Sequence, residues 1–269
     1  GYDFAAEGQP LKLHGEWTNG VLESPMIVEA MRLFGAPDAV DEFVMYKPAG
    51  LFDAAFDIDY AGGDAKPMYA ITSRPRSLSV QIHDTPVYAD IEGGTVTFRP
   101  GRIEIDDLVG RHAGGVFGID GVATIDGAID AQLSMKYDGR LISNQVLAFL
   151  PVEAREALTA IEFADGGASR LEDCTLHLTE IPVEGGALRW RSDFRGVVRT
   201  SDASFTTGVR FTEVNGAFAV DAKHDPGQPV KLTLAADVDR MKALGQSLHN
   251  ATWTISLSDS GDEVTVPEF

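Results

Sequence analysis

The sequence predicts a mainly β fold: a long, twisted antiparallel sheet with one apolar face, curled into an open groove or a partly closed barrel, with two short helical segments. Three observations lead to this prediction. Apolar and polar residues alternate over much of the chain, which is the period of a strand with one buried side. Turn-forming pairs such as Asp-Gly and Pro-Gly separate these runs at short intervals. The alternation of strands and helices that a parallel sheet requires is not found.

Two helical segments interrupt the strand pattern. The first covers residues 24–46, in which Ser24 is suited to cap the helix and Pro25 to be its first helical residue. Gly35-Ala36-Pro37 ends this helix, and a second short helix is expected from Asp38 to about residue 46. The other segment covers residues 143–161 and is interrupted at Pro151.

The strand runs are clearest at residues 52–59, 131–137, 230–238 and 252–258, where every second residue is apolar. A hairpin is expected around Pro100-Gly101, because alternating runs flank this pair on both sides. Further bends are predicted at Asp120-Gly121, Asp126-Gly127, Asp138-Gly139 and Pro226-Gly227.

Similar segments recur along the chain and suggest two divergent copies of one unit. Residues 1–142 would form the first helix-plus-strands unit, and residues 143–269 a second copy that continues the same sheet. The alignment places Pro37 on Pro151 and residues 90–94 on residues 193–197. Chance similarity between short glycine-containing strands is the alternative explanation.

The charge of the chain excludes some classes of partner. The net charge is -19, from 41 acidic and 22 basic residues, so a nucleic-acid partner is not expected. Charge alone would not draw the chain to an anionic membrane either. No apolar run approaches the roughly 18 residues of a membrane span, so we expect membrane attachment only through an anchor that this chain does not contain.

Signals of catalysis or of cofactor binding are weak, and we expect no enzyme activity, no cofactor and no metal. Nucleotide-binding, hydrolase and zinc motifs are missing, and the six His are scattered along the sequence. Alternation places Asp57 and Asp59 together on a solvated face, but with 41 acidic residues such pairs are expected by chance. Cys174 lies in an alternating run and is expected to be a small buried apolar group.

The apolar face is therefore the remaining candidate site. Two short helical segments cannot cover a dozen strands, and each methylene of a ligand buried there would contribute roughly 0.8 kcal/mol. Ordinary core packing is the alternative role for each residue of the face. The candidate groove-lining residues that would contact acyl chains are Phe98, Ile105, Met135, Tyr137, Leu232, Leu234, Trp253 and Ile255.

The spacing of glycine and apolar residues in the predicted strands at residues 87–98, 103–110 and 114–121 resembles that of the AsmA/TamB-like family. In these strands Gly-Gly pairs precede alternating apolar residues, and the likeness extends over about residues 48–266. The resemblance implies a segment of a larger bacterial protein, periplasmic and held by an inner-membrane anchor. It also implies a β-groove that binds or conducts phospholipid acyl chains in outer-membrane maintenance, with other envelope proteins as further partners. The family supplies no catalytic residues.

Two other functions remain open at this point. One is a structural or interaction β-module of an envelope or extracellular protein, which has a filled interior and no ligand. The other is a carbohydrate-active enzyme, which needs a cleft with convergent carboxylates and stacking aromatic residues. Aromatic residues make up only 9% of the chain and only three are Trp, so the enzyme ranks last.

Overall fold

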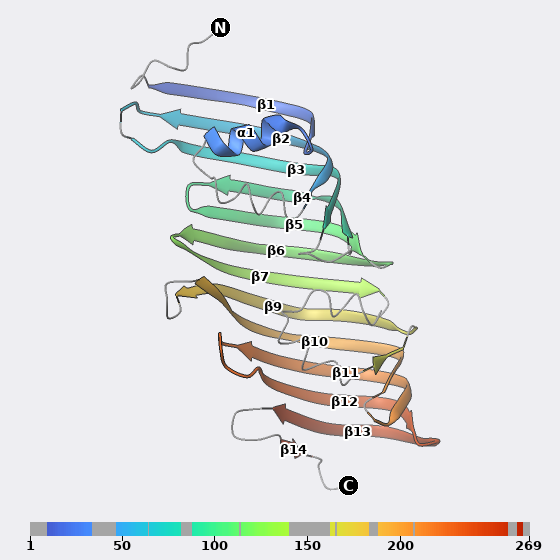
Figure 1. Cartoon of the computed structure of the whole chain (residues 1–269). Coiled ribbons are helices and arrows are strands. Elements are labelled where there is room, and N and C mark those ends of the chain that lie inside the picture. The colour runs from blue at the N-terminus through green and yellow to red at the C-terminus, as the bar shows by residue number, and fades with distance from the viewer. Residues whose placement is uncertain are drawn as a thin grey trace. The chain divides into compact units, whose positions relative to one another are not determined.

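The computed structural model describes residues 10–33, 47–63, 65–81, 88–112, 114–139, 162–164, 166–182, 188–206, 208–257 and 263–265. It confirms the mainly β fold, because these residues form one antiparallel sheet that is not closed into a barrel (Figure 1). The strand order is β1-β2-β3-β4-β5-β6-β7-β9-β10-β11-β12-β13-β14, and β8 pairs with β10. Neighbours in the sheet are therefore mostly neighbours in the sequence.

Twelve of the strands are long, and β8 and β14 have only two and three residues. The elements are β1 (Leu11–Val21), α1 (Pro25–Leu33), β2 (Ala49–Tyr60), β3 (Met68–Gln81), β4 (Tyr88–Arg99), β5 (Arg102–His112), β6 (Gly115–Asp126), β7 (Ala128–Gly139), β8 (Glu162–Phe163), β9 (Ala168–Pro182), β10 (Leu188–Thr206), β11 (Arg210–His224), β12 (Lys231–Ala243), β13 (Gln246–Leu257) and β14 (Glu263–Thr265).

The helix predicted to begin at Pro25 is confirmed as α1. Ser24 caps it as expected: its carbonyl accepts a hydrogen bond from the Ile27 amide at 3.0 Å, and its hydroxyl faces the Met26 amide at 3.4 Å. The helices predicted at residues 38–46 and 143–161 lie outside the described residues.

Most of the predicted turns are also confirmed. Pro100-Gly101 joins β4 to β5, and Gly127 and Gly227 lie between consecutive strands. Two predicted bends are wrong. Asp120-Gly121 lies inside β6, and Asp138-Gly139 forms the end of β7, where it pairs with Arg170 and Ser169 of β9. A Cβ atom at Gly121 would lie 2.4 Å from the Gln132 carbonyl oxygen, so this glycine permits close approach of two backbones rather than a turn.

The chain groups into two compact units, residues 1–110 with 122–125 and residues 111–121 with 126–269. Unit 1 holds α1 and β1–β4, unit 2 holds β7–β14, and β5 and β6 contribute residues to both. The two sequence copies with a boundary between residues 142 and 143 stay a prediction.

Buried apolar side chains occur in both units, and a packed cluster of them lies in unit 2. A cluster of buried apolar side chains spans β10 to β13, and four partly buried aromatic residues pack against it. The cluster consists of Ala203, Val214, Ala236, Val238, Met241 and Ala251, with Phe205, Phe211, Phe218 and Trp253 around it. Most other apolar side chains of the unit are only half-buried.

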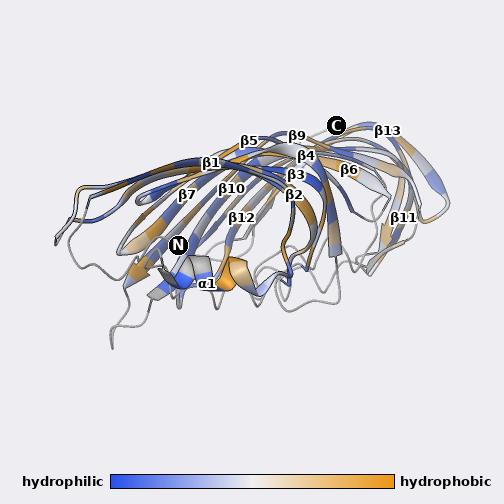
Figure 2. Cartoon of the chain, turned by 90° about the horizontal axis from the view of Figure 1, so that it is seen from above, coloured by the Kyte–Doolittle hydropathy of each residue, from blue (hydrophilic) through white to orange (hydrophobic). Residues whose placement is uncertain are grey.

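Residues with positive φ occur inside many strands and interrupt the simple alternation. At Asn19, Asp173, Asp202 and Glu213 the pairing register shifts, and the two residues that share a face are three positions apart instead of two. In β9, for example, Leu171 and Cys174 flank Asp173, whose φ is 50°. Such bulges bend a strand and increase its twist, and β11, which contains Glu213, curves along its length (Figure 2). The six residues are Asn19, Asp107, Asp173, Asp202, Glu213 and Asn250.

Candidate functional site

Apolar side chains in unit 2 line up in rows that cross the strands. Residues directly opposite each other in an antiparallel pair lie on the same face of the sheet. The pairing partners can therefore be followed from β7 to β13. The longest row, here named the Tyr137 row, contains Tyr137, Leu171, Val198, Phe218, Ala236 and Trp253.

Two further rows run beside the first. The Met135 row contains Met135, Cys174, Gly196, Val220, Leu234 and Ile255, where Gly196 lies directly against the Cys174 thiol. The Leu133 row contains Leu133, Leu176, Phe194, Ala222 and Leu232. These three rows together are named the apolar face of unit 2. They bring together six of the eight residues predicted from the sequence: Met135, Tyr137, Leu232, Leu234, Trp253 and Ile255.

The side chains of this face are half-exposed rather than packed under a second layer. All residues of the three rows are partly exposed except Cys174 and Ala236, which are buried. Phe218 and Trp253 contact each other edge to face, with ring centroids 6.3 Å apart. The described residues of unit 2 thus present a continuous, partly solvated apolar surface.

The two faces of unit 2 differ sharply in charge. The three rows contain no charged side chain, whereas the opposite face is crossed by ion pairs between neighbouring strands. Arg199 Nε lies 2.6 Å from a Glu172 carboxylate oxygen, and Arg195 Nε lies 3.3 Å from one of Asp221. Hydrogen bonding to Glu172 raises the pKa of Arg199, and hydrogen bonding to Lys242 lowers that of Glu213. All of these groups are solvated, so they contribute little to stability and chiefly mark the wet face.

The other two predicted residues lie in unit 1, which has apolar rows of its own. Phe98 belongs to a row with Gly15, Phe56 and Ile71, and 37% of it is exposed. In β5, the Glu104 carboxylate faces Arg102 at 2.7 Å and Arg99 at 3.7 Å. Because side chains alternate along a strand, Ile105 points to the side opposite Glu104.

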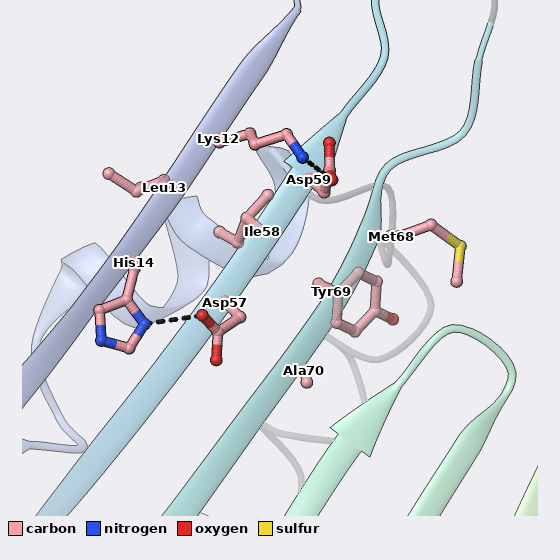
Figure 3. Close-up of a pocket in the computed structure, with 9 residues that line it drawn as sticks. All are labelled: Lys12, Leu13, His14, Asp57, Ile58, Asp59, Met68, Tyr69 and Ala70. Atoms are coloured by element: carbon pink, nitrogen blue, oxygen red, sulfur yellow. Dashed lines mark hydrogen bonds and ion pairs between the residues drawn. The ribbon is translucent and has the colours of Figure 1, made fainter.

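A surface hollow of about 500 Å³ at the ends of β1, β2 and β3 is not a convergent site (Figure 3). Its lining consists of three consecutive pairing rows, which point alternately to the two faces of the sheet. Lys12 binds Asp59 at 2.8 Å, and His14 binds Asp57 at 2.6 Å. The predicted pair of carboxylates on the wet face is therefore real, but each carboxylate has a basic neighbour on β1.

A His-Asp-Thr cluster on β7 and β9 has the residue types of a catalytic triad but not its geometry. His177 Nε2 lies 3.0 Å from Asp130 Oδ1 and 3.2 Å from Thr179 Oγ1. In a catalytic triad, one nitrogen of the histidine ring contacts the carboxylate and the other nitrogen contacts the hydroxyl. Here a single nitrogen contacts both groups, so the cluster is suited to pairing two strands.

Cys174 is completely buried, as its sequence pattern predicted. Burial raises the pKa of its thiol, which keeps it protonated and unreactive. Among the described residues, no group of three or more His, Cys, Asp or Glu side chains is arranged to hold a metal ion. The part of the chain that the structure describes also has no helix that is long and apolar enough to cross a membrane.

The strand bulges are the structural feature that the alternation pattern missed. Their signal in the sequence is an apolar or small residue, any residue, then Asp, Asn or Glu, then another apolar or small residue. Trp17-Thr18-Asn19-Gly20 and Leu171-Glu172-Asp173-Cys174 are examples. Asp and Asn tolerate positive φ better than most residues, which explains why they occupy these positions.

Comparisons with known proteins identify no relative. No family model matches the chain, and neither the curated proteins nor the solved structures contain a match.

Proposed function

We propose that the chain is a segment of a periplasmic β-groove protein of the bacterial envelope, and that the apolar face of unit 2 binds lipid acyl chains. The observation that carries the proposal is the set of three uncharged, half-exposed rows across β7 and β9–β13. The cellular location rests on the resemblance of the spacing of glycine and apolar residues to that of AsmA/TamB-like proteins.

The dimensions of the face suit an acyl chain. The Tyr137 row crosses five strand spacings, which at about 4.8 Å each gives a length of roughly 24 Å. One leaflet of a bilayer core is about 15 Å thick, so a row is longer than one acyl chain. Ten methylenes removed from water would contribute about 8 kcal/mol before the costs of binding.

The charge distribution also favours this class of ligand. An uncharged lining offers no partner to a lipid headgroup, so we expect the headgroup to stay in solvent while the chain lies on the rows. A peptide ligand would leave its backbone polar groups without partners on such a surface. The ion pairs of the opposite face keep that side of the sheet in water.

A matched pair of variants in β12 tests the proposal. Leu234→Glu places a charge in the middle of the apolar face, and Ala235→Glu places the same charge on the opposite face of the same strand. We expect Leu234→Glu to weaken the binding of oleate at least tenfold, because a carboxylate beside an acyl chain loses its hydration. Isothermal titration calorimetry at equal protein concentration measures the change, and Ala235→Glu should bind like the parent chain.

Native mass spectrometry of gently purified protein provides an independent measurement. Phospholipid that co-purifies with the parent chain and is lost from Leu234→Glu supports the proposal. If no lipid co-purifies and oleate does not bind, the apolar face is a packing surface and the chain is a structural or interaction module instead.

A further inference from the structure

The outer edge of β1 pairs with no strand in the part of the chain that the structure describes. β1 has a strand partner, β2, on one side only among the described residues. It is 11 residues long and contains no proline. The edge of such a strand presents free amide and carbonyl groups that can pair with another strand.

The regular part of this edge has a natural centre. β1 pairs with β2 without interruption from Leu11 to Trp17, after which the register shifts before Gly20. Asn19, with φ of 53°, bends the strand at that point. The straight segment therefore has His14 at its middle. An antiparallel pairing of two such segments around His14 uses the whole segment and stops short of the bulge.

The charged residues of β1 favour the register that is centred on His14. Pairing around His14 places Lys12 of one copy opposite Glu16 of the other, and does so twice. Lys12 contacts Asp59, yet its side chain is 83% exposed, which leaves ammonium donors free. Glu16 stands opposite Ala55 and has no ion-pair partner among the described residues.

Neighbouring registers that keep side chains on matching faces are less favourable. If the two-fold axis passed through Lys12, the two lysines would face each other. If it passed through Glu16, the two glutamates would face each other. Centring on Leu13 sets Lys12 against His14, and centring on Gly15 runs the pairing into the bulge at Asn19. Like charges directly opposite each other destabilise a sheet, whereas opposite charges stabilise it.

We propose that two copies of the chain associate through residues 11–17 of β1, antiparallel, about a two-fold axis at His14. Directly opposed residues share a face of the sheet. Leu11 and Leu13 of one copy then stand beside Trp17 and Gly15 of the other. The apolar rows of unit 1 would continue from one copy into the next, and the polar side would hold the two Lys-Glu pairs.

A cysteine on the axis tests both the contact and its register. Opposed Cα atoms in an antiparallel pair are about 4.5–5.5 Å apart, within the range of a disulfide. In a Cys174→Ala background, His14→Cys should form a covalent dimer on mild oxidation. Glu16→Cys is the matched control, because the two Glu16 positions would be about 13 Å apart and should stay unlinked. His14 and Glu16 are both exposed, so neither change disturbs a core.

Light scattering on the unmodified chain gives the second measurement. We expect a dimer at micromolar concentration in physiological salt. Glu16→Lys should weaken the dimer several-fold by opposing two lysines, and Glu16→Lys with Lys12→Glu should restore it. A monomeric parent chain whose His14→Cys variant does not cross-link overturns the proposal. Efficient cross-linking of Glu16→Cys but not of His14→Cys overturns the register. Neither result bears on whether the apolar face of unit 2 binds lipid.

Discussion

At the scale of single residues, the strained positions inside the strands follow a chemical rule. Within the strands, non-glycine residues with positive φ are Asp, Asn or Glu. Outside the strands, Lys47 and Leu244 also have positive φ. Leu244 lies in the hairpin between β12 and β13, has φ of 50° and is 82% exposed. Leu244 precedes Gly245, which has φ of 77°, so this two-residue turn has the backbone that Asn-Gly normally adopts.

Replacing Leu244 by Asn should stabilise the chain. Asn accepts positive φ more easily than Leu and removes an exposed apolar side chain from solvent. We expect the free energy of unfolding to rise by about 1 kcal/mol, measured by urea denaturation. Ser247→Asn, at an exposed position of β13 with ordinary strand geometry, is the control and should bring no gain. A loss of stability in Leu244→Asn would mean that the leucine makes a contact that outweighs its backbone strain.

For single residues of the apolar face of unit 2, the sequence could predict part of the arrangement. Alternation assigned Met135, Tyr137, Leu232, Leu234, Trp253 and Ile255 to the apolar side of their own strands, and the pairing places them on one face. It could not predict which residues form a row, because register depends on pairing between strands rather than on the pattern within one. Each bulge also shifts the phase of the pattern within its strand.

At the scale of the elements, glycines decide how closely neighbouring strands approach. At Gly216 in β11, a Cβ atom would lie 2.4 Å from the Asp237 carbonyl oxygen and 2.7 Å from Val238 Cα. Both are backbone atoms of β12, which cannot move without breaking the ladder. Gly121 in β6 has the same role beside Gln132 of β7. The Asp-Gly pair predicts a turn at Gly121. In the sequence, a glycine that lets two backbones approach closely cannot be distinguished from a glycine that forms a bend.

We therefore expect Gly216→Ala to destabilise the chain. The added methyl group collides with the β12 backbone, and overpacking of this kind costs about 1–3 kcal/mol. Gly93→Ala is the control, because a Cβ atom at Gly93 would meet nothing within 4 Å. Thermal unfolding followed by circular dichroism distinguishes the two. Equal melting temperatures for both variants would show that the strands can separate to admit the methyl group.

At the scale of the whole molecule, the excess of acidic residues works against folding. The chain carries 41 acidic and 22 basic residues, so even if every base were paired, 19 negative charges would remain. Exposed ion pairs such as Lys12–Asp59 contribute little each, whereas repulsion among the remaining carboxylates acts over the whole surface.

Added sodium chloride should consequently stabilise the chain. Screening shortens the range of repulsion from about 30 Å at 0.01 M salt to about 8 Å at 0.15 M. We expect the melting temperature to rise by several degrees over this range and then to level off. Differential scanning calorimetry at constant pH measures the effect, with sodium bromide as a second salt to separate screening from ion-specific effects. A falling melting temperature would mean that the ion pairs outweigh the repulsion.

The strand order has a consequence for how the chain reaches its structure. From β1 to β7 and again from β9 to β13, each strand pairs with the one synthesised just before it. A chain built this way can fold in the order in which it leaves the ribosome, one hairpin at a time. Such local pairing keeps the entropy of loop closure small at each step. The steps from β1 to β2 and from β7 to β9 span the two longest intervening segments, residues 22–48 and 140–167, so strand pairing should be slowest at these two points.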